Sequence, residues 1–125
     1  MSAGELDISF GVNGKRLAYY NNTSEYDGIQ VLFIQNDDKI LCGGYYSTDD
    51  GNAYVILLRF TENGNFDNSF NSNGKFLTDV ESSANQNSKP LLLQSNNKMV
   101  IIGGYSINND TNFVLKRYNT NCTVD

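Results

Sequence analysis

Apolar residues occur in short runs that are separated by polar, turn-forming stretches. Residues 29–35 read Ile-Gln-Val-Leu-Phe-Ile-Gln, and a second run at 39–46 follows the polar tripeptide 36–38. Short apolar runs rich in β-branched and aromatic residues predict strands that are covered on both faces. Because Asn and Asp tolerate the conformations of tight turns, the tripeptide predicts a hairpin between the two runs. No segment has a helical period of apolar residues.

The same order of runs and turns occurs twice along the chain. Asp7, Phe10 and Gly14 recur in register as Asp67, Phe70 and Gly74, since 67 − 7, 70 − 10 and 74 − 14 all give 60. A fixed period of this length is typical of repeat architectures. Each half predicts four strands, at 15–20, 29–35, 39–46 and 53–60, and then at 75–80, 90–94, 98–105 and 112–118.

Four short strands per repeat, with turn signals between them, predict an all-β protein. A four-stranded antiparallel sheet in a repeat of this length is typical of one blade of a β-propeller. We therefore expect one propeller segment over residues 1–125, with repeat one at 4–63, repeat two at 64–121 and the start of a third repeat box at 122–125. The two blades would need a ring completed by further copies or further repeats.

The recurring residues resemble the delta-60 repeat, a β-propeller repeat of bacterial surface and secreted proteins. The resemblance rests on a first box with Gly, Leu, Asp, Ser, Phe and two Gly, a second box with Gln, Asp, Lys, Ile, Leu and Gly, and a closing Arg with Phe or Tyr. In this chain these are Gly4, Leu6, Asp7, Ser9, Phe10, Gly11 and Gly14, then Gln35, Asp37, Lys39, Ile40, Leu41 and Gly44, then Arg59 and Phe60. The second copy has Phe66, Asp67, Ser69, Phe70 and Gly74, then Gln94, Lys98 and Gly103, then Arg117 and Tyr118.

The chain departs from the family pattern in three places. The expected Asp-Gly turn is Asp37-Asp38 in one copy and Asn96-Asn97 in the other, Asn71 replaces a glycine, and Cys122 stands at a box glycine. The resemblance implies a propeller and an extracellular or cell-surface location, although the chain has no signal peptide. It supplies no defined catalytic residue.

Two interpretations of the partial third box remain open. The chain is either a piece of a longer repeat array or a short protomer whose overlapping ends let copies close into a ring. Two blades cannot bury their own faces, because repeat units need neighbours on both sides. Two, three or four copies would supply four, six or eight blades, and we expect a homo-oligomer, with a trimer favoured.

Charge and composition exclude several function classes. The net charge is −5 and the pI is about 4.5, which argues against nucleic acid and anionic membranes as partners. The chain has no His, so the usual general base and most zinc and haem chemistry are missing. Cys42 and Cys122 are expected to be buried thiols, with a disulfide between them as the alternative.

Candidate functional residues fall into a structural set and a tentative ligand set. Asp7 and Asp67 are expected to accept backbone N–H groups in turns, Phe10 and Phe70 to anchor seams between blades, and Gly14 and Gly74 to allow the box turns. The tyrosines Tyr45, Tyr46 and Tyr105 could form a ligand rim, with packing within the sheet as the alternative.

We expect a protein without catalytic activity or cofactor, with a structural or binding role and a possible glycan or protein ligand. A lectin-like module that uses tyrosines and loop carboxylates is the alternative. A glycosidase-type hydrolase that uses Glu5 with Asp7, or Asp37 with Asp38, is a further one. The oxygen-rich loops 49–52 and 108–112 have ligands suited to calcium but lack the spacing of a calcium-binding loop, so polar loops are expected there.

Overall fold

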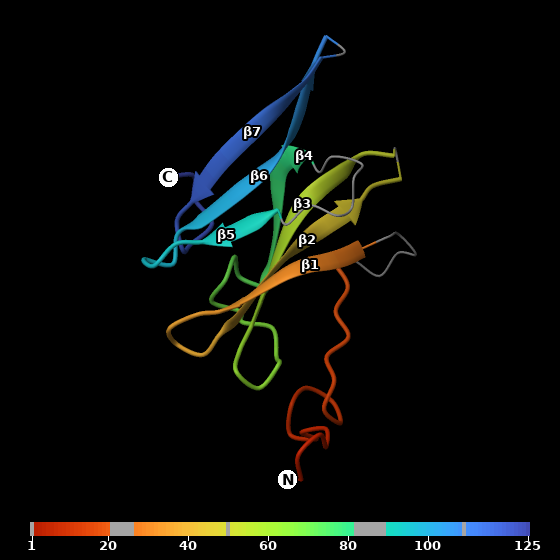
Figure 1. The fold of residues 1–125 in the computed structure, drawn as a ribbon, viewed down its shortest axis with the longest axis vertical. Coiled ribbons are helices and arrows are strands. Elements are labelled where there is room, and N and C mark those ends of the chain that lie inside the picture. Colours follow the sequence, from red (N-terminus) through yellow and green to blue (C-terminus); the bar gives the residue numbers. More distant parts are fainter. Residues whose placement is uncertain (1, 21–26, 50, 82–89, 109) are drawn as a thin grey trace.

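The computed structural model describes residues 2–20, 27–49, 51–81, 90–108 and 110–125, and seven strands lie within them (Figure 1). The strands are β1 (Asp27–Ile34), β2 (Ile40–Ser47), β3 (Ala53–Phe60), β4 (Lys75–Glu81), β5 (Leu91–Leu93), β6 (Met99–Ile107) and β7 (Asp110–Tyr118). The described residues contain no helix, and so none that could span a membrane.

The strands form two antiparallel sheets. In the first, β1, β2, β3 and β4 pair in sequence order, and in the second β6 lies between β5 and β7. A single residue pair, Glu81 with Gly104, joins β4 to β6 and so connects the two sheets. The all-β fold predicted from the sequence is confirmed, and the described residues form an open arrangement of two blades without a closed ring.

One predicted strand does not form. Residues 15–20 run as extended chain without pairing as a strand, and the fourth strand of the first sheet is β4, which belongs to the second repeat. In β4, Phe76 pairs with Leu57 and Leu77 pairs with Ile56 of β3. Strand propensity is realised only where a segment joins a partner edge, and residues 15–20 join none of the described strands. The first sheet is therefore offset from the sequence repeat, because its outer strand comes from the following copy.

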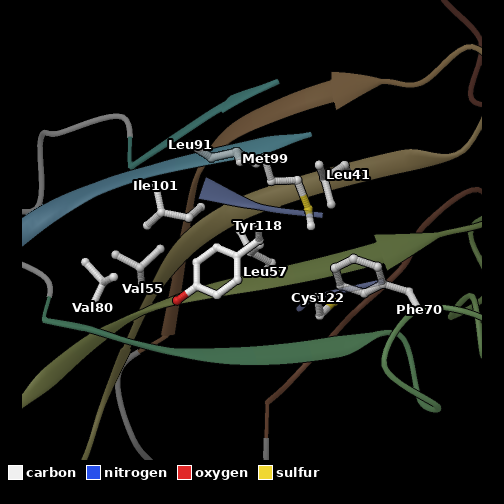
Figure 2. Packing of buried hydrophobic residues seen from close by; sticks show 10 residues of the cluster. All are labelled: Leu41, Val55, Leu57, Phe70, Val80, Leu91, Met99, Ile101, Tyr118 and Cys122. Atoms are coloured by element: carbon white, nitrogen blue, oxygen red, sulfur yellow. The ribbon is translucent and has the colours of Figure 1, made fainter. Parts of the chain in front are cut away.

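The main core lies between the two sheets (Figure 2). Leu41, Val55 and Leu57 from the first sheet face Met99 and Ile101 from the second, and all five are at most 1% exposed. A second cluster covers the opposite face of the first sheet, where the side chains of Cys42, Ile56, Leu58 and Phe60 pack with those of Ala18 and Tyr20. The near-continuous apolar runs are thus explained by burial on both faces of β2 and β3.

The turns that depart from the family pattern are nonetheless tight. Asp38 and Asn97 adopt φ angles of 60° and 62°, and their N–H groups donate to the carbonyl oxygens of Gln35 at 3.0 Å and Gln94 at 2.9 Å. Asp and Asn are the residues that reach this left-handed region most easily after glycine. The replacement of glycine has therefore left the hairpin geometry intact in both copies.

Candidate functional site

The second copy of the repeat box forms a buried ionic cluster at the end of β3. Asp67 accepts a hydrogen bond from Arg59 Nε at 2.8 Å, and Lys39 Nζ lies 3.3 Å from the same carboxylate oxygen. The other carboxylate oxygen of Asp67 accepts from the N–H of Ser69 at 3.0 Å and from its hydroxyl at 2.7 Å. Arg59 in turn stacks over the ring of Phe70, with its central carbon 4.6 Å from the ring centroid. The cluster ties together β3, the β1–β2 turn and the box.

The cluster keeps Asp67 ionised. Burial opposes the charge, but hydrogen bonds from Ser69 and Lys39 and the nearby Arg59 guanidinium outweigh it and lower the pKa of Asp67 to about 2. A carboxylate that is held this strongly by cations and donors is a poor general acid or base near neutral pH. Its geometry is that of a structural junction.

Gly74 completes this junction. Its φ of +77° lies in the left-handed region, and its N–H donates to the carbonyl oxygen of Phe70 at 2.7 Å. A Cβ added there would lie 2.9 Å from the Phe66 ring and 3.0 Å from the carbonyl oxygen of Arg59. Both the conformation and the space therefore require glycine. Phe70 is fully buried, within the apolar cluster that lies between the two sheets.

The same cluster occurs at the end of β7. Asp125 accepts from Arg117 Nε, and Lys98 Nζ lies 2.6 Å from its other oxygen. Hydrogen bonds from Lys98, with smaller contributions from Arg117, lower the pKa of Asp125 below its ordinary value. Arg117, Lys98 and Asp125 correspond to Arg59, Lys39 and Asp67 of the first cluster, since 117 − 59 and 125 − 67 both give 58 and 98 − 39 gives 59.

The first box lacks these cations. Asp7 accepts from the N–H of Ser9 at 3.0 Å and from its hydroxyl at 2.6 Å, and these bonds lower its pKa. No arginine or lysine ion pair to Asp7 occurs within the described ranges. Phe10 lies against Gly64, and Gly14 has a φ of +80°. The box therefore has its local shape but not the cations that hold the other two.

Of the three tyrosines expected to form a ligand rim, the two whose side chains are described, Tyr45 and Tyr46, do not share one exposed surface. Tyr46 is 5% exposed and its ring packs 4.8 Å from that of Tyr20, within the second cluster. Tyr45 is half-buried and borders a small cavity of about 70 Å³ together with Tyr20 and Gly28. The backbone of Tyr105 pairs with that of Asn112 in the second sheet, and its side chain lies outside the described part.

The other candidate groups are engaged locally or are buried. Asp37 pairs with Lys39 at 3.3 Å, and Glu5 accepts from the N–H of Ser2 at 3.0 Å. Cys42 and Cys122 are free thiols, and burial raises the pKa of each to about 11. Asp50 and Asn109 of the oxygen-rich loops lie outside the described residues. Among the residues that are described, no group of three or more His, Cys, Asp or Glu could hold a metal ion.

Each sheet also has a group of apolar side chains that the rest of the described chain leaves exposed. On the first sheet, Ile29, Leu32 and Ile34 are 50–60% exposed, and Ile29 and Leu32 border a groove of about 390 Å³. On the second sheet, Phe113 is 95% exposed and Leu115 is 70% exposed, beside Leu92 and Ile102. Contiguous exposed apolar surface of this kind marks an interaction site.

Sequence reasoning missed the role of Lys39 and Lys98, which it named only as recurring residues of the second box. Both lysines reach a box aspartate 27–28 residues away in the chain, since 67 − 39 gives 28 and 125 − 98 gives 27. The signal was present in the sequence, because lysine, arginine and aspartate all recur in register.

Comparison with known families found one match. The model of a family described as "Domain of unknown function (DUF5122) beta-propeller" matches residues 35–70 and 94–125, which together are more than half of the chain. A search of curated proteins found no match, and a search of solved structures found none either.

Proposed function

This chain belongs to the DUF5122 β-propeller family, and we propose that it is a non-catalytic propeller repeat module with a structural or binding role. The observation that carries the proposal is the repeated ionic cluster. Its carboxylates and cations pair with one another at the ends of β3 and β7, and at β3 the Ser69 hydroxyl joins them. The delta-60 repeat is the specific repeat type that we propose, on the box residues that form these clusters.

The state of the most buried carboxylate supports a structural role. Asp67 is 6% exposed and carries a pKa of about 2, so it remains an anion held by Arg59 and Lys39. A hydrolase that uses two carboxylates needs one of them protonated near neutral pH, in a cleft that admits substrate. The groove beside Leu32 is instead lined mainly by apolar side chains.

A panel of chromogenic glycosides, esters and phosphate esters tests this proposal. We expect the parent chain to show no saturable turnover above that of the Asp37→Asn variant, which lacks one carboxylate of the candidate pair in an exposed turn. Saturable turnover that Asp37→Asn or Asp38→Asn abolishes would replace the proposal with a carboxylate-based hydrolase.

The lectin-like alternative has one supporting observation, the small cavity beside Tyr45 and Tyr20. A glycan array probes it directly. Binding that Tyr45→Ala removes, while Tyr54→Ala on the neighbouring strand retains it, would favour this alternative.

A further inference from the structure

The outer edge of β7 lacks the partner that its counterpart has. β3 and β7 occupy the same place in their sheets, and β3 is flanked by β2 on one side and by β4 on the other. Within the described ranges β7 pairs with β6 alone, apart from an isolated bridge between Tyr118 and Val124. An open edge with free backbone groups is a template for another strand.

The segment that corresponds to β4 is present in the chain but is not used as a strand. Residues 15–20 correspond to 75–80 of β4, since 75 − 15 gives 60. Their side chains already alternate as in a strand, with Arg16, Ala18 and Tyr20 half-buried and Leu17 and Tyr19 exposed. A period of two along extended chain is the pattern of a strand with one covered face.

The stretch that leads into this segment and the segment itself already pack against the first sheet, in the same way that the box and β4 pack against the second. Phe70 packs in the same cluster as Cys122, and the corresponding pair is Phe10 against Gly64 (70 − 10 = 60, 122 − 64 = 58). Likewise Val80 packs with the second sheet, and the corresponding Tyr20 packs with Tyr46 of the first (80 − 20 = 60). Residues 10–20 thus take the position that the end of a preceding blade would take.

We propose that residues 15–20 of one copy add to β7 of a second copy as its fourth strand, in a head-to-tail assembly. The register follows from the pairing of β3 with β4. The observed pairs are Leu58 with Lys75, Leu57 with Phe76 and Ile56 with Leu77. Adding 58 to each β3 residue and subtracting 60 from each β4 residue gives the expected pairs, which are Lys116 with Lys15, Leu115 with Arg16 and Val114 with Leu17. Lys116 already pairs with Asp79, which offsets the like charge of Lys15.

The two open apolar faces fit the same assembly. Phe113 and Leu115 correspond to Val55 and Leu57, whose face is covered by the second sheet (113 − 55 = 58, 115 − 57 = 58). Leu32 and Ile34 correspond to Leu91 and Leu93, which cover that face (91 − 32 = 59, 93 − 34 = 59).

The interface between the two sheets is therefore a template for a second interface, in which the Phe113/Leu115 face of one copy meets the Leu32/Ile34 face of the next. A contact of this kind joins unlike surfaces, and it gives a ring where the rotation between copies closes. This assembly gives the proposed structural module a second copy of the chain as its partner, and it is tested by mass rather than by turnover.

Two positions make the new interface differ from its template. Ile102 stands where the first sheet has Gly43, so the partner's Leu32 meets a side chain there instead of the open backbone that Leu91 approaches. Asp125 occupies the cationic pair Arg117 and Lys98, to which the corresponding Asp7 of the partner would otherwise bind. The partner segment therefore docks from Phe10 onward, with Asp125 in the place of its Asp7.

Light scattering on the full chain tests the assembly. With a chain mass of 13.9 kDa, we expect species of two to four copies, at 27.8, 41.7 or 55.6 kDa (2, 3 or 4 × 13.9). Samples spanning about 1–200 µM cover a micromolar dissociation constant. A mass of 13.9 kDa across this whole range would overturn the proposal.

A mixing experiment tests the head-to-tail geometry. Leu115→Lys blocks one face and Leu32→Lys blocks the other, so each variant alone should be a monomer with an unchanged β-type circular dichroism spectrum. An equimolar mixture should give the 27.8 kDa dimer (2 × 13.9), because each variant keeps the face that the other needs. Self-association of either variant alone, or a mixture that stays monomeric, would contradict the geometry. Asn36→Lys, at an exposed turn position, is the matched control and should assemble as the parent does.

A disulfide test examines the register. Residues that lie opposite each other in paired strands can be bridged, whereas neighbours on the other face cannot. Oxidation of the variant that carries Leu115→Cys and Arg16→Cys should give linked copies on a denaturing gel. The control with Leu115→Cys and Leu17→Cys should give far fewer. Equal linkage in both would overturn the proposed pairing.

Discussion

The buried carboxylate of Asp67 offers the sharpest test of what holds the blades together, through the variant Asp67→Asn. This substitution keeps the size of the side chain and an oxygen that can accept from Ser69, but it removes the charge that Arg59 and Lys39 face. The side chain of Asp67 is 8% exposed and Arg59 is 10% exposed, so solvent screens the pair little.

The magnitude follows from linkage between protonation and folding. A pKa of about 2 in the folded state, against an ordinary value of 3.8, corresponds to about 2 kcal/mol of stability at neutral pH. Because the folded-state pKa is depressed, this stability is complete above the unfolded pKa and is lost as the pH falls from about 5 to 2. Loss of one partner from a buried ion pair adds a cost, because Arg59 is left uncompensated.

Urea unfolding of the parent and of Asp67→Asn at several pH values, followed by circular dichroism, measures this difference. We expect the parent to be more stable by about 2 kcal/mol or more at pH 7 and by progressively less toward pH 2.5. Asp7→Asn is the matched control, because Asp7 has the same bonds to Ser9 without a cation, and it should change stability much less. A difference for Asp67→Asn that does not depend on pH would refute the reasoning, since it would show that the charge contributes nothing.

Three further predictions address packing and chemistry. Phe70→Ala should lower the free energy of unfolding by about 3–5 kcal/mol, because the ring is fully buried between the sheets; a loss below about 1 kcal/mol in urea unfolding would contradict this burial. Gly43→Ala should cost about 1–3 kcal/mol, because its Cβ would lie 2.7 Å from that of Leu91, and unchanged thermal unfolding would show that the sheets move apart freely. The thiols of Cys42 and Cys122, each with its pKa raised to about 11, should react slowly with a thiol reagent at pH 8 and rapidly in urea; equal rates would show that they are accessible in the folded chain.

Sequence patterns located the strands well where each strand finds its partner within the chain. The runs at 29–35, 39–46 and 53–60 became β1, β2 and β3 almost residue for residue, because alternating burial and tight turns are local properties. The run at 90–94 shortened to the three residues of β5, since Pro90 has no N–H to donate and only its carbonyl oxygen accepts, from Ile102. Residues 15–20 have the same pattern as β4 but pair with no strand of the described chain.

The candidate site was harder to predict for the same physical reason. The bonds from Asp67 to Ser69 span two residues, and the sequence pattern indicated them. The contact with Lys39 needs the β1–β2 turn and the box to meet in space, which no local pattern specifies. The tyrosines expected at a ligand rim were also hard to place, because the sequence Tyr45-Tyr46 does not indicate which ring is buried in the core and which is exposed.

The offset between sheet and sequence repeat has a consequence for how such a chain could evolve. The outer strand β4 of the first sheet is encoded with the repeat that builds the second, so the first blade is completed by a strand from its successor. A duplication or deletion of one whole repeat period would leave each completing strand paired with a neighbouring blade of the same sequence pattern. Lengthening or shortening the array is then a matter of counting periods, without a new interface having to arise.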